Sequence, residues 1–200
     1  MCILDTEDLY VECKKIGELP KNTSRRNVSG IDIPWLQKHG YNTSGHKLAD
    51  LSRRIIPRGL PCESITFGQQ RVFLQKRCVP CKANAEFPYV YMELKNLAEK
   101  AFPEFKYNCI TLNHNLQCLP HRDSINNVRQ SHSIILGFGD YTGGDLNIEG
   151  CDFNIKNNPL IFNGQRSTHA TMDYEGDRWS VIYYYKYYPT HYAGYTDTLH

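Results

Sequence analysis

The sequence has no long hydrophobic run: no stretch of its 200 residues approaches the roughly 18 apolar residues that a membrane-spanning helix needs. Its N-terminal segment also lacks the basic part and the apolar part of a secretory signal. Nor is it poor in hydrophobic residues, which make up 40% of the chain and exclude a disordered polymer. We therefore expect a soluble, intracellular protein with no membrane contact, folded as a single domain over residues 1–200.

Motifs that pair cysteines are scarce, although the chain holds eight cysteines. The one CxxC motif joins Cys78 and Cys81, and no second CxxC or HxxxH supplies the other two ligands of a closed zinc site. Cys62 and His114 could complete such a site through the fold. Without an export signal, we expect reduced thiols in preference to a disulfide framework or a structural zinc ion.

The net charge of +2 conceals a basic segment. Residues 14–77 carry 13 Lys or Arg against four acidic residues, a net charge of +9, and the rest of the chain is net negative. Such a segment is a plausible footprint for a polyanion such as DNA or RNA, although a solvated basic surface has the same composition. Trp35, Tyr41 and Phe67 lie in this segment and could stack on bases, with packing in the core as the alternative.

Two parts of the chain differ in their patterns. Residues 1–106 form a basic support region with loops, an expected strand at 65–74 and a helix at 88–101, where a proline suits the first turn and apolar residues recur at helical spacing. In residues 107–188, short strands between turn residues are expected at 107–113, 131–137, 145–148, 159–162 and 179–187. These patterns favour an α+β, mainly β fold, whose core is a double-stranded β-helix, or jelly roll, braced by N-terminal helices.

One motif in the strand-rich part suggests metal chemistry. His121 and Asp123 stand two residues apart, so on a strand both side chains project from the same face. His169 follows the turn at Asn163-Gly164, where an opposing strand could deliver it. Two histidines and one carboxylate occupy one face of an octahedron and leave three positions open, as in non-haem iron(II) oxygenases. His-x-Asp alone is expected roughly 0.4 times by chance in this composition, so the motifs that follow it give it weight.

Arg178 lies nine residues after His169, at the start of the strand expected at 179–187, and Ser180 shares its face. A guanidinium group pairs bidentately with a carboxylate, and a neighbouring hydroxyl adds a further hydrogen bond. The distal carboxylate of 2-oxoglutarate needs such partners while its keto-acid end chelates iron. We therefore predict that Arg178 anchors this co-substrate. An arginine on a sheet is otherwise usually an exposed surface group, so the prediction depends on the offset from His169.

Three runs of sequence, at 112–124, 136–146 and 169–184, together resemble the 2-oxoglutarate/iron(II) dioxygenase superfamily. Within it they are most similar to the TET/JBP branch, whose members oxidise the 5-methyl group of methylcytosine or thymine in nucleic acid. The cysteine-rich zinc region of the larger TET enzymes has only remnants here. The resemblance implies a C–H hydroxylase that uses Fe(II), 2-oxoglutarate and O2. It implies His121, Asp123 and His169 as iron ligands and catalytic residues, and Arg178, Ser180 and Asn113 as residues that bind the co-substrate.

The sequence is compatible with more than one class of substrate. The resemblance and the basic segment point to a methylated pyrimidine in DNA or RNA, which would have to be flipped out of a duplex to react. Arg122 could contact that substrate, with turn formation around it as the alternative. A prolyl-type protein hydroxylase of the same superfamily stays open, because its branch also suits the Gly-x-Arg sequence that ends at Arg178. A metal-free jelly-roll module that binds a partner without catalysis is a further alternative.

Overall fold

In a computed structural model, the structure describes residues 3–17, 19, 63–72, 77–118, 120–123 and 132–186. Most of the basic segment, with Trp35, Tyr41 and Cys62, lies outside these residues. The predictions made for them are therefore untested.

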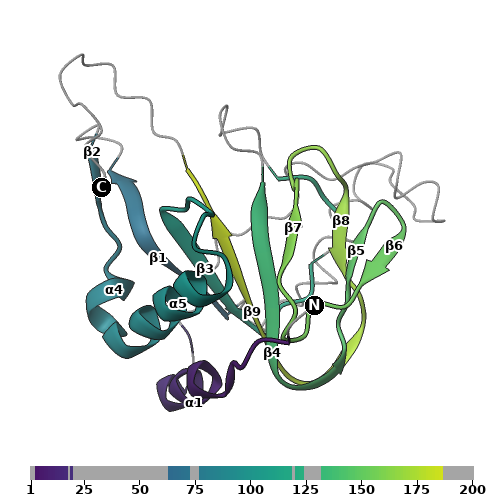
Figure 1. Cartoon of the computed structure of the whole chain (residues 1–200), viewed down its shortest axis with the longest axis horizontal. Coiled ribbons are helices and arrows are strands. Elements are labelled where there is room, and N and C mark those ends of the chain that lie inside the picture. The colour runs from purple at the N-terminus through teal and green to yellow at the C-terminus, as the bar shows by residue number, and fades with distance from the viewer. Residues whose placement is uncertain are drawn as a thin grey trace, which may run out of the picture.

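Antiparallel strands form two sheets, and the fold is mainly β and jelly-roll-like (Figure 1). The larger sheet has six strands in the order β2-β1-β3-β9-β4-β7, and the smaller has three in the order β6-β5-β8. The strands of the larger sheet are β1 (Glu63–Val72), β2 (Arg77–Pro80), β3 (Cys109–His114), β4 (Ser133–Gly143), β7 (Leu160–Phe162) and β9 (Tyr174–Tyr184). The smaller sheet consists of β5 (Leu146–Ile148), β6 (Cys151–Phe153) and β8 (His169–Thr171).

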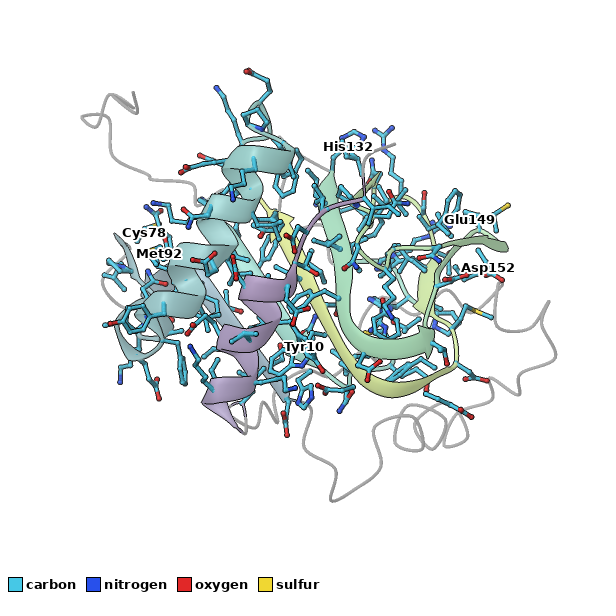
Figure 2. All side chains as sticks on the ribbon, turned by 60° about the horizontal axis from the view of Figure 1, so that its bottom comes forward. Tyr10, Cys78, Met92, His132, Glu149 and Asp152 are labelled. Atoms are coloured by element: carbon cyan, nitrogen blue, oxygen red, sulfur yellow. The ribbon has the colours of Figure 1, made fainter. Side chains whose placement is uncertain are left out.

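Helices gather beside β1, β3 and β9, while β5, β6 and β8 lie at the other end of the molecule (Figure 1). They are α1 (Glu7–Ile16), α4 (Ala83–Glu86) and α5 (Pro88–Ala101). Acidic residues in the first turn of α1 and lysines in its last turn complement the helix dipole. The main core lies between α1, α5 and one face of the larger sheet, with Leu94, Phe67 and Val181 fully buried. Tyr10 on α1 and Met92 on α5 mark these helices in Figure 2.

A second, smaller core fills the opposite face of the larger sheet. It joins four buried residues, Ile135, Leu146, Ile155 and Phe162, with Ile182 of β9 packed against them. Along β9, side chains therefore alternate between the helix side and the inside of the roll, as the period of two requires. Arg178 and Ser180 share the inner face with Ile182.

Several expected elements are confirmed and others are corrected. The helix at 88–101 is confirmed with the same bounds. However, β4 runs six residues beyond the expected end, and β9 begins five residues before the expected start, because the two strands pair along their full lengths from Ser133–Tyr184 to Gly143–Tyr174. The connection between β4 and β5 is correspondingly shorter than the gap between the strands expected at 131–137 and 145–148. The helix α1 and the short strands β2, β6 and β8 were not predicted.

Phe67 corrects another prediction. Its side chain is fully buried in the main core and stacks on Tyr91 with ring centroids 5.7 Å apart, so it is not available to stack on a base. Core packing, the alternative reading, is the one observed. Among the described residues, none of the helices is long and apolar enough to cross a membrane.

Candidate metal centre

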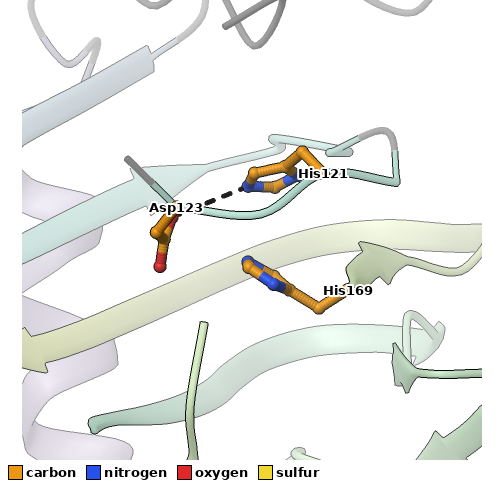
Figure 3. A group of neighbouring side chains, drawn as sticks. All are labelled: His121, Asp123 and His169. Carbon is orange, nitrogen blue, oxygen red and sulfur yellow. Dashed lines mark ion pairs between the residues drawn. The ribbon is translucent and has the colours of Figure 1, made fainter. Parts of the chain in front are cut away.

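The three predicted metal ligands lie together. His121, Asp123 and His169 each offer a ligand atom, and these atoms all lie within 4.8 Å of one another. In the part of the chain that the structure describes, no other group of three His, Cys, Asp or Glu side chains could hold a metal ion. Figure 3 shows the three side chains converging on one space, with His121 and Asp123 from one segment and His169 from β8. Iron binding remains a prediction, but the grouping that it requires is present.

Backbone pairing places these side chains. The His121 N–H donates to the His169 carbonyl at 3.0 Å and the His169 N–H donates to the His121 carbonyl at 2.9 Å, which adds the His121 segment to the smaller sheet beside β8. The Asp123 N–H donates to the Gly164 carbonyl at 2.8 Å. His121 and Asp123 therefore face His169 from a neighbouring, strand-like segment, as their spacing predicted.

Hydrogen bonding fixes the orientation of His169, which is buried. Its Nδ1 lies 3.1 Å from the Ser167 carbonyl oxygen, which can only accept a hydrogen bond. A hydrogen bond between them has Nδ1 as the donor, and in that tautomer the Nε2 lone pair is left for a metal. The Nε2 atom of His121 lies 3.9 Å from an Asp123 carboxylate oxygen, a separation with room for an ion to bridge the two.

Arg178 is the most deeply buried charged residue of the described chain, with a relative exposure of 1%. Its Nη1 donates to the Leu116 carbonyl at 3.3 Å and its Nη2 to the Gly144 carbonyl at 3.1 Å. No carboxylate among the described residues pairs with it, and its Nε has no hydrogen-bond partner there. A buried cation without a counter-ion is costly, so this site fits an anion other than the carboxylates of the described residues.

Tyr141 stands beside this guanidinium group and was missed by the sequence analysis. Its ring centroid lies 5.5 Å from the Arg178 Cζ, and its hydroxyl is, besides the Arg178 Nε, the other fully buried side-chain N or O atom of the described residues without a hydrogen-bond partner. Burial raises the pKa of Tyr141, and the nearby guanidinium group offsets only part of that rise. The hydroxyl is therefore protonated at neutral pH and can donate to a carboxylate. The ring of Tyr174 flanks Arg178 as well, with its centroid 5.2 Å from the Arg178 Cζ.

Ser180 and Asn113 also lie on the inner face, in adjacent strands. The Asn113 amide donates to the Ser180 hydroxyl at 3.3 Å and accepts from Ser64 at 2.9 Å, and all three residues are buried. The structure thus brings the two predicted co-substrate residues into contact with each other. Their contact with 2-oxoglutarate stays a prediction.

Arg122 does not belong to the group of possible metal ligands that its two neighbours in the sequence form with His169. It is exposed, its Nε donates to the Thr168 hydroxyl at 3.3 Å, and its Nη2 lies 3.9 Å from the Glu149 carboxylate. The predicted contact with substrate is not tested by these interactions. They do give Arg122 a local role in joining its segment to the one before β8.

The CxxC motif takes no part in a recognised metal group among the described residues. Cys81 is buried, and burial raises the pKa of its thiol to about 11, so it is protonated at neutral pH. His114, a possible fourth ligand, instead lies between two carboxylates, 2.5 Å from Glu63 and 2.6 Å from Asp177. Cys78 is exposed and lies at the opposite end of the molecule from Glu149 (Figure 2).

No protein-family model and no curated protein matches the sequence. Similar solved structures include NgTET1 in complex with 5mC DNA, at 12% identity and a TM-score of 0.44, covering 89% of this chain and 88% of that one. An oxidoreductase of the 2OG-Fe(II) oxygenase family from Burkholderia pseudomallei has 16% identity and a TM-score of 0.44, covering 85% of this chain and 95% of that one. A prolyl-4-hydroxylase from Pseudomonas putida has 14% identity and a TM-score of 0.37, covering 70% and 84%. Likeness at this level assigns no chemistry, which has to come from the site.

Proposed function

We propose that this chain is an iron(II)- and 2-oxoglutarate-dependent dioxygenase that hydroxylates a C–H bond. The observation that carries the proposal is the grouping of two histidines and one carboxylate around one space, since this ligand set leaves positions open for a co-substrate and dioxygen. Bound iron(II) would supply the activation of dioxygen. His121, Asp123 and His169 would hold it, and with the His169 proton on Nδ1, its Nε2 would be the ligand atom.

The surroundings of Arg178 support 2-oxoglutarate as the co-substrate. The unpartnered Arg178 Nε and the protonated hydroxyl of Tyr141 provide two donors for a carboxylate in a buried environment. Burial strengthens such charge-assisted hydrogen bonds because water does not compete for the donors. In this proposal Arg178 and Tyr141 bind the distal carboxylate, and Asn113 and Ser180 line the inner face beside it.

We also propose that the core is a double-stranded β-helix, over residues 107–188 of a single domain. The order β3-β9-β4-β7 in one sheet supports it, together with β6-β5-β8 and the His121 segment in the other. In such a fold, both sheets contribute side chains to the space between them. Metal ligands from the smaller sheet and Arg178 from the larger sheet follow that arrangement.

For the substrate we propose the 5-methyl group of a methylated pyrimidine in DNA or RNA. The net charge of +9 over residues 14–77 supports a polyanion, and the resemblance of the sequence to the TET/JBP branch supports a methyl group. If phosphates contribute to binding, the affinity must fall steeply with salt concentration, which is not required of a peptide substrate. Salt dependence therefore separates this proposal from a prolyl-type hydroxylase.

The test uses the whole chain, loaded anaerobically with iron(II). Binding of 2-oxoglutarate is followed by the visible absorption that a 2-oxo acid gives on chelating iron(II). Succinate release in air is then measured across methylated DNA, methylated RNA and proline peptides. We expect iron and 2-oxoglutarate to bind together, and a methylated nucleic acid to stimulate turnover most. Failure to bind both would refute the dioxygenase proposal, and stimulation by the proline peptide alone would refute the proposed substrate.

Two pairs of variants make this test specific. His121→Ala is expected to lose iron, whereas the exposed His132→Ala should bind it normally. Arg178→Gln is expected to keep iron and to weaken 2-oxoglutarate binding by roughly 10- to 150-fold, because a hydrogen bond to a charged group contributes about 1.5–3 kcal/mol. The exposed Lys100→Gln is the matched loss of one positive charge. A binding module without catalysis would give no succinate in any of these proteins.

A further inference from the structure

The end of β3 makes an unusual connection to Arg178. The strand ends at His114, and the next residue, Asn115, has a φ of 48°, in the left-handed region that asparagine tolerates better than most residues. The Asn115 N–H donates to the Arg178 carbonyl at 2.8 Å, and its side-chain Oδ1 accepts from the Arg178 N–H at 2.9 Å. One residue therefore bonds both backbone groups of Arg178.

This connection also reaches the guanidinium group. After the turn at Asn115 the chain presents the Leu116 carbonyl to Arg178 Nη1, and the Gly144 carbonyl accepts from Nη2 on the other side. The backbone of Arg178 and the end of its side chain are thus fixed by two consecutive residues. Only the Nε is left without a partner among the described residues, next to the hydroxyl of Tyr141.

We infer that Asn115 is a positioning residue, which sets the affinity for the co-substrate by fixing the place and direction of Arg178. The inference rests on the proposed function. Asparagine suits the position for two reasons that only aspartate shares: it tolerates the left-handed conformation, and its side chain supplies the acceptor for the Arg178 N–H. Glycine satisfies the first requirement alone.

The competing explanation is a purely structural role, in which Asn115 only stabilises the end of β3 against β9. The pairing of β3 with β9 has further contacts near this point, on the side of α1. There His114 contacts Asp177 at 2.6 Å, and the Tyr10 hydroxyl donates to Asp177 at 2.8 Å, which connects α1 to β9. His114 Nε2 also lies 3.1 Å from the Asn115 side-chain nitrogen, but the Tyr10–Asp177 hydrogen bond and the backbone pairing of β3 with β9 do not involve Asn115. The pairing of the two strands should therefore survive the loss of the Asn115 side chain. The loss of the Asn115 side chain should instead change how Arg178 is held, and so the affinity for the co-substrate.

The experiment compares Asn115→Gly, which keeps the backbone conformation and removes the acceptor, with Asn115→Asp, which retains an acceptor. Dissociation constants are measured on the iron-loaded whole chain for 2-oxoglutarate and for 2-oxovalerate, which has the same keto-acid end but no distal carboxylate. We expect Asn115→Gly to weaken 2-oxoglutarate binding roughly three- to tenfold, the value of one hydrogen bond. Iron affinity and 2-oxovalerate binding should change less than twofold, and Asn115→Asp should bind 2-oxoglutarate as the wild type does.

An Arg178→Gln background provides a second readout. If Asn115 acts through Arg178, the two losses are not additive, and Asn115→Gly should have little further effect there. Three results would each overturn the inference: unchanged 2-oxoglutarate binding, an equal loss for 2-oxovalerate, or unfolding of Asn115→Gly. If the wild type itself binds iron but not 2-oxoglutarate, the proposed function fails and this inference fails with it.

Discussion

Replacing Gly164 by alanine should weaken metal binding while leaving the fold intact. A Cβ atom at this position would lie 2.1 Å from Asp123 Oδ2 and 3.1 Å from its Cγ. The φ of Gly164 is not in the left-handed region, so alanine meets no backbone strain there. The carboxylate is the flexible partner in this contact. We expect it to move away while the backbone, tied by the Asp123 N–H to the Gly164 carbonyl, stays in place.

The size of the displacement predicts the size of the effect. To reach 3.0 Å, below which real Cβ contacts hardly occur, the Asp123 oxygen must withdraw by about 0.9 Å. Metal–ligand distances tolerate changes of only about 0.2 Å, so the carboxylate would no longer reach an ion held by the two histidines. Substitutions that misplace a metal ligand typically weaken metal binding by about 10- to 100-fold. We expect a loss in that range.

Anaerobic titration with iron(II) measures this loss, and thermal unfolding of the metal-free protein measures the fold. Gly137→Ala is the matched control: it too has no left-handed φ, but its Cβ would lie 2.3 Å from the Tyr141 hydroxyl. That variant should keep iron affinity and lose affinity for 2-oxoglutarate. Equal iron affinity in Gly164→Ala and the wild type would refute the reasoning, as would equal losses of iron in the two variants.

Two further outcomes concern the fold. Leu94→Ala should lower the free energy of unfolding by about 2–5 kcal/mol, since Leu94 is fully buried, whereas the half-exposed Met92→Ala on the same helix should change it by less than about 0.5 kcal/mol in chemical denaturation. Burial alone would raise the pKa of the Asp177 carboxyl, but hydrogen bonds from His114 and Tyr10 leave it below its ordinary value. Asp177 therefore stabilises the fold above about pH 4, and the difference in melting temperature between wild type and Asp177→Asn should shrink as pH falls below that value. A difference that grows on acidification would contradict this assignment.

Local patterns were enough to predict that His121 and Asp123 lie on one side of their segment, and to predict the best helix. His121 and Asp123 lie on one side of their segment because extended backbone places residues two apart on one face, and this depends on nothing distant in the sequence. The helix at 88–101 follows from its first-turn proline and its apolar spacing. Arg178 was found by its offset from His169, although its burial, which makes it chemically informative, could not be read from that offset.

Features that depend on a distant partner were not predictable in the same way. β4 and β9 extend well past their expected ends because each supplies the other's hydrogen bonds, and a single strand's composition does not show how far its partner reaches. Tyr141 became part of the site for the same reason. It pairs with Gly176, two residues before Arg178, and only the register of the two strands brings the hydroxyl to the guanidinium group.

Glycines offered a signal that the sequence analysis left unused. Glycine is usually explained by its backbone freedom, but neither Gly137 nor Gly164 has a left-handed φ, so that explanation does not apply. At both positions a polar group fills the space that a side chain would need. The Tyr141 hydroxyl lies where a Cβ of residue 137 would be, and the Asp123 carboxylate lies where a Cβ of residue 164 would be. A glycine inside a strand or beside a turn, where its conformation is ordinary, can therefore mark a neighbouring polar group that must be placed without obstruction. Of the glycines that the structure describes, the two with an ordinary φ lie next to the groups proposed to bind iron and 2-oxoglutarate.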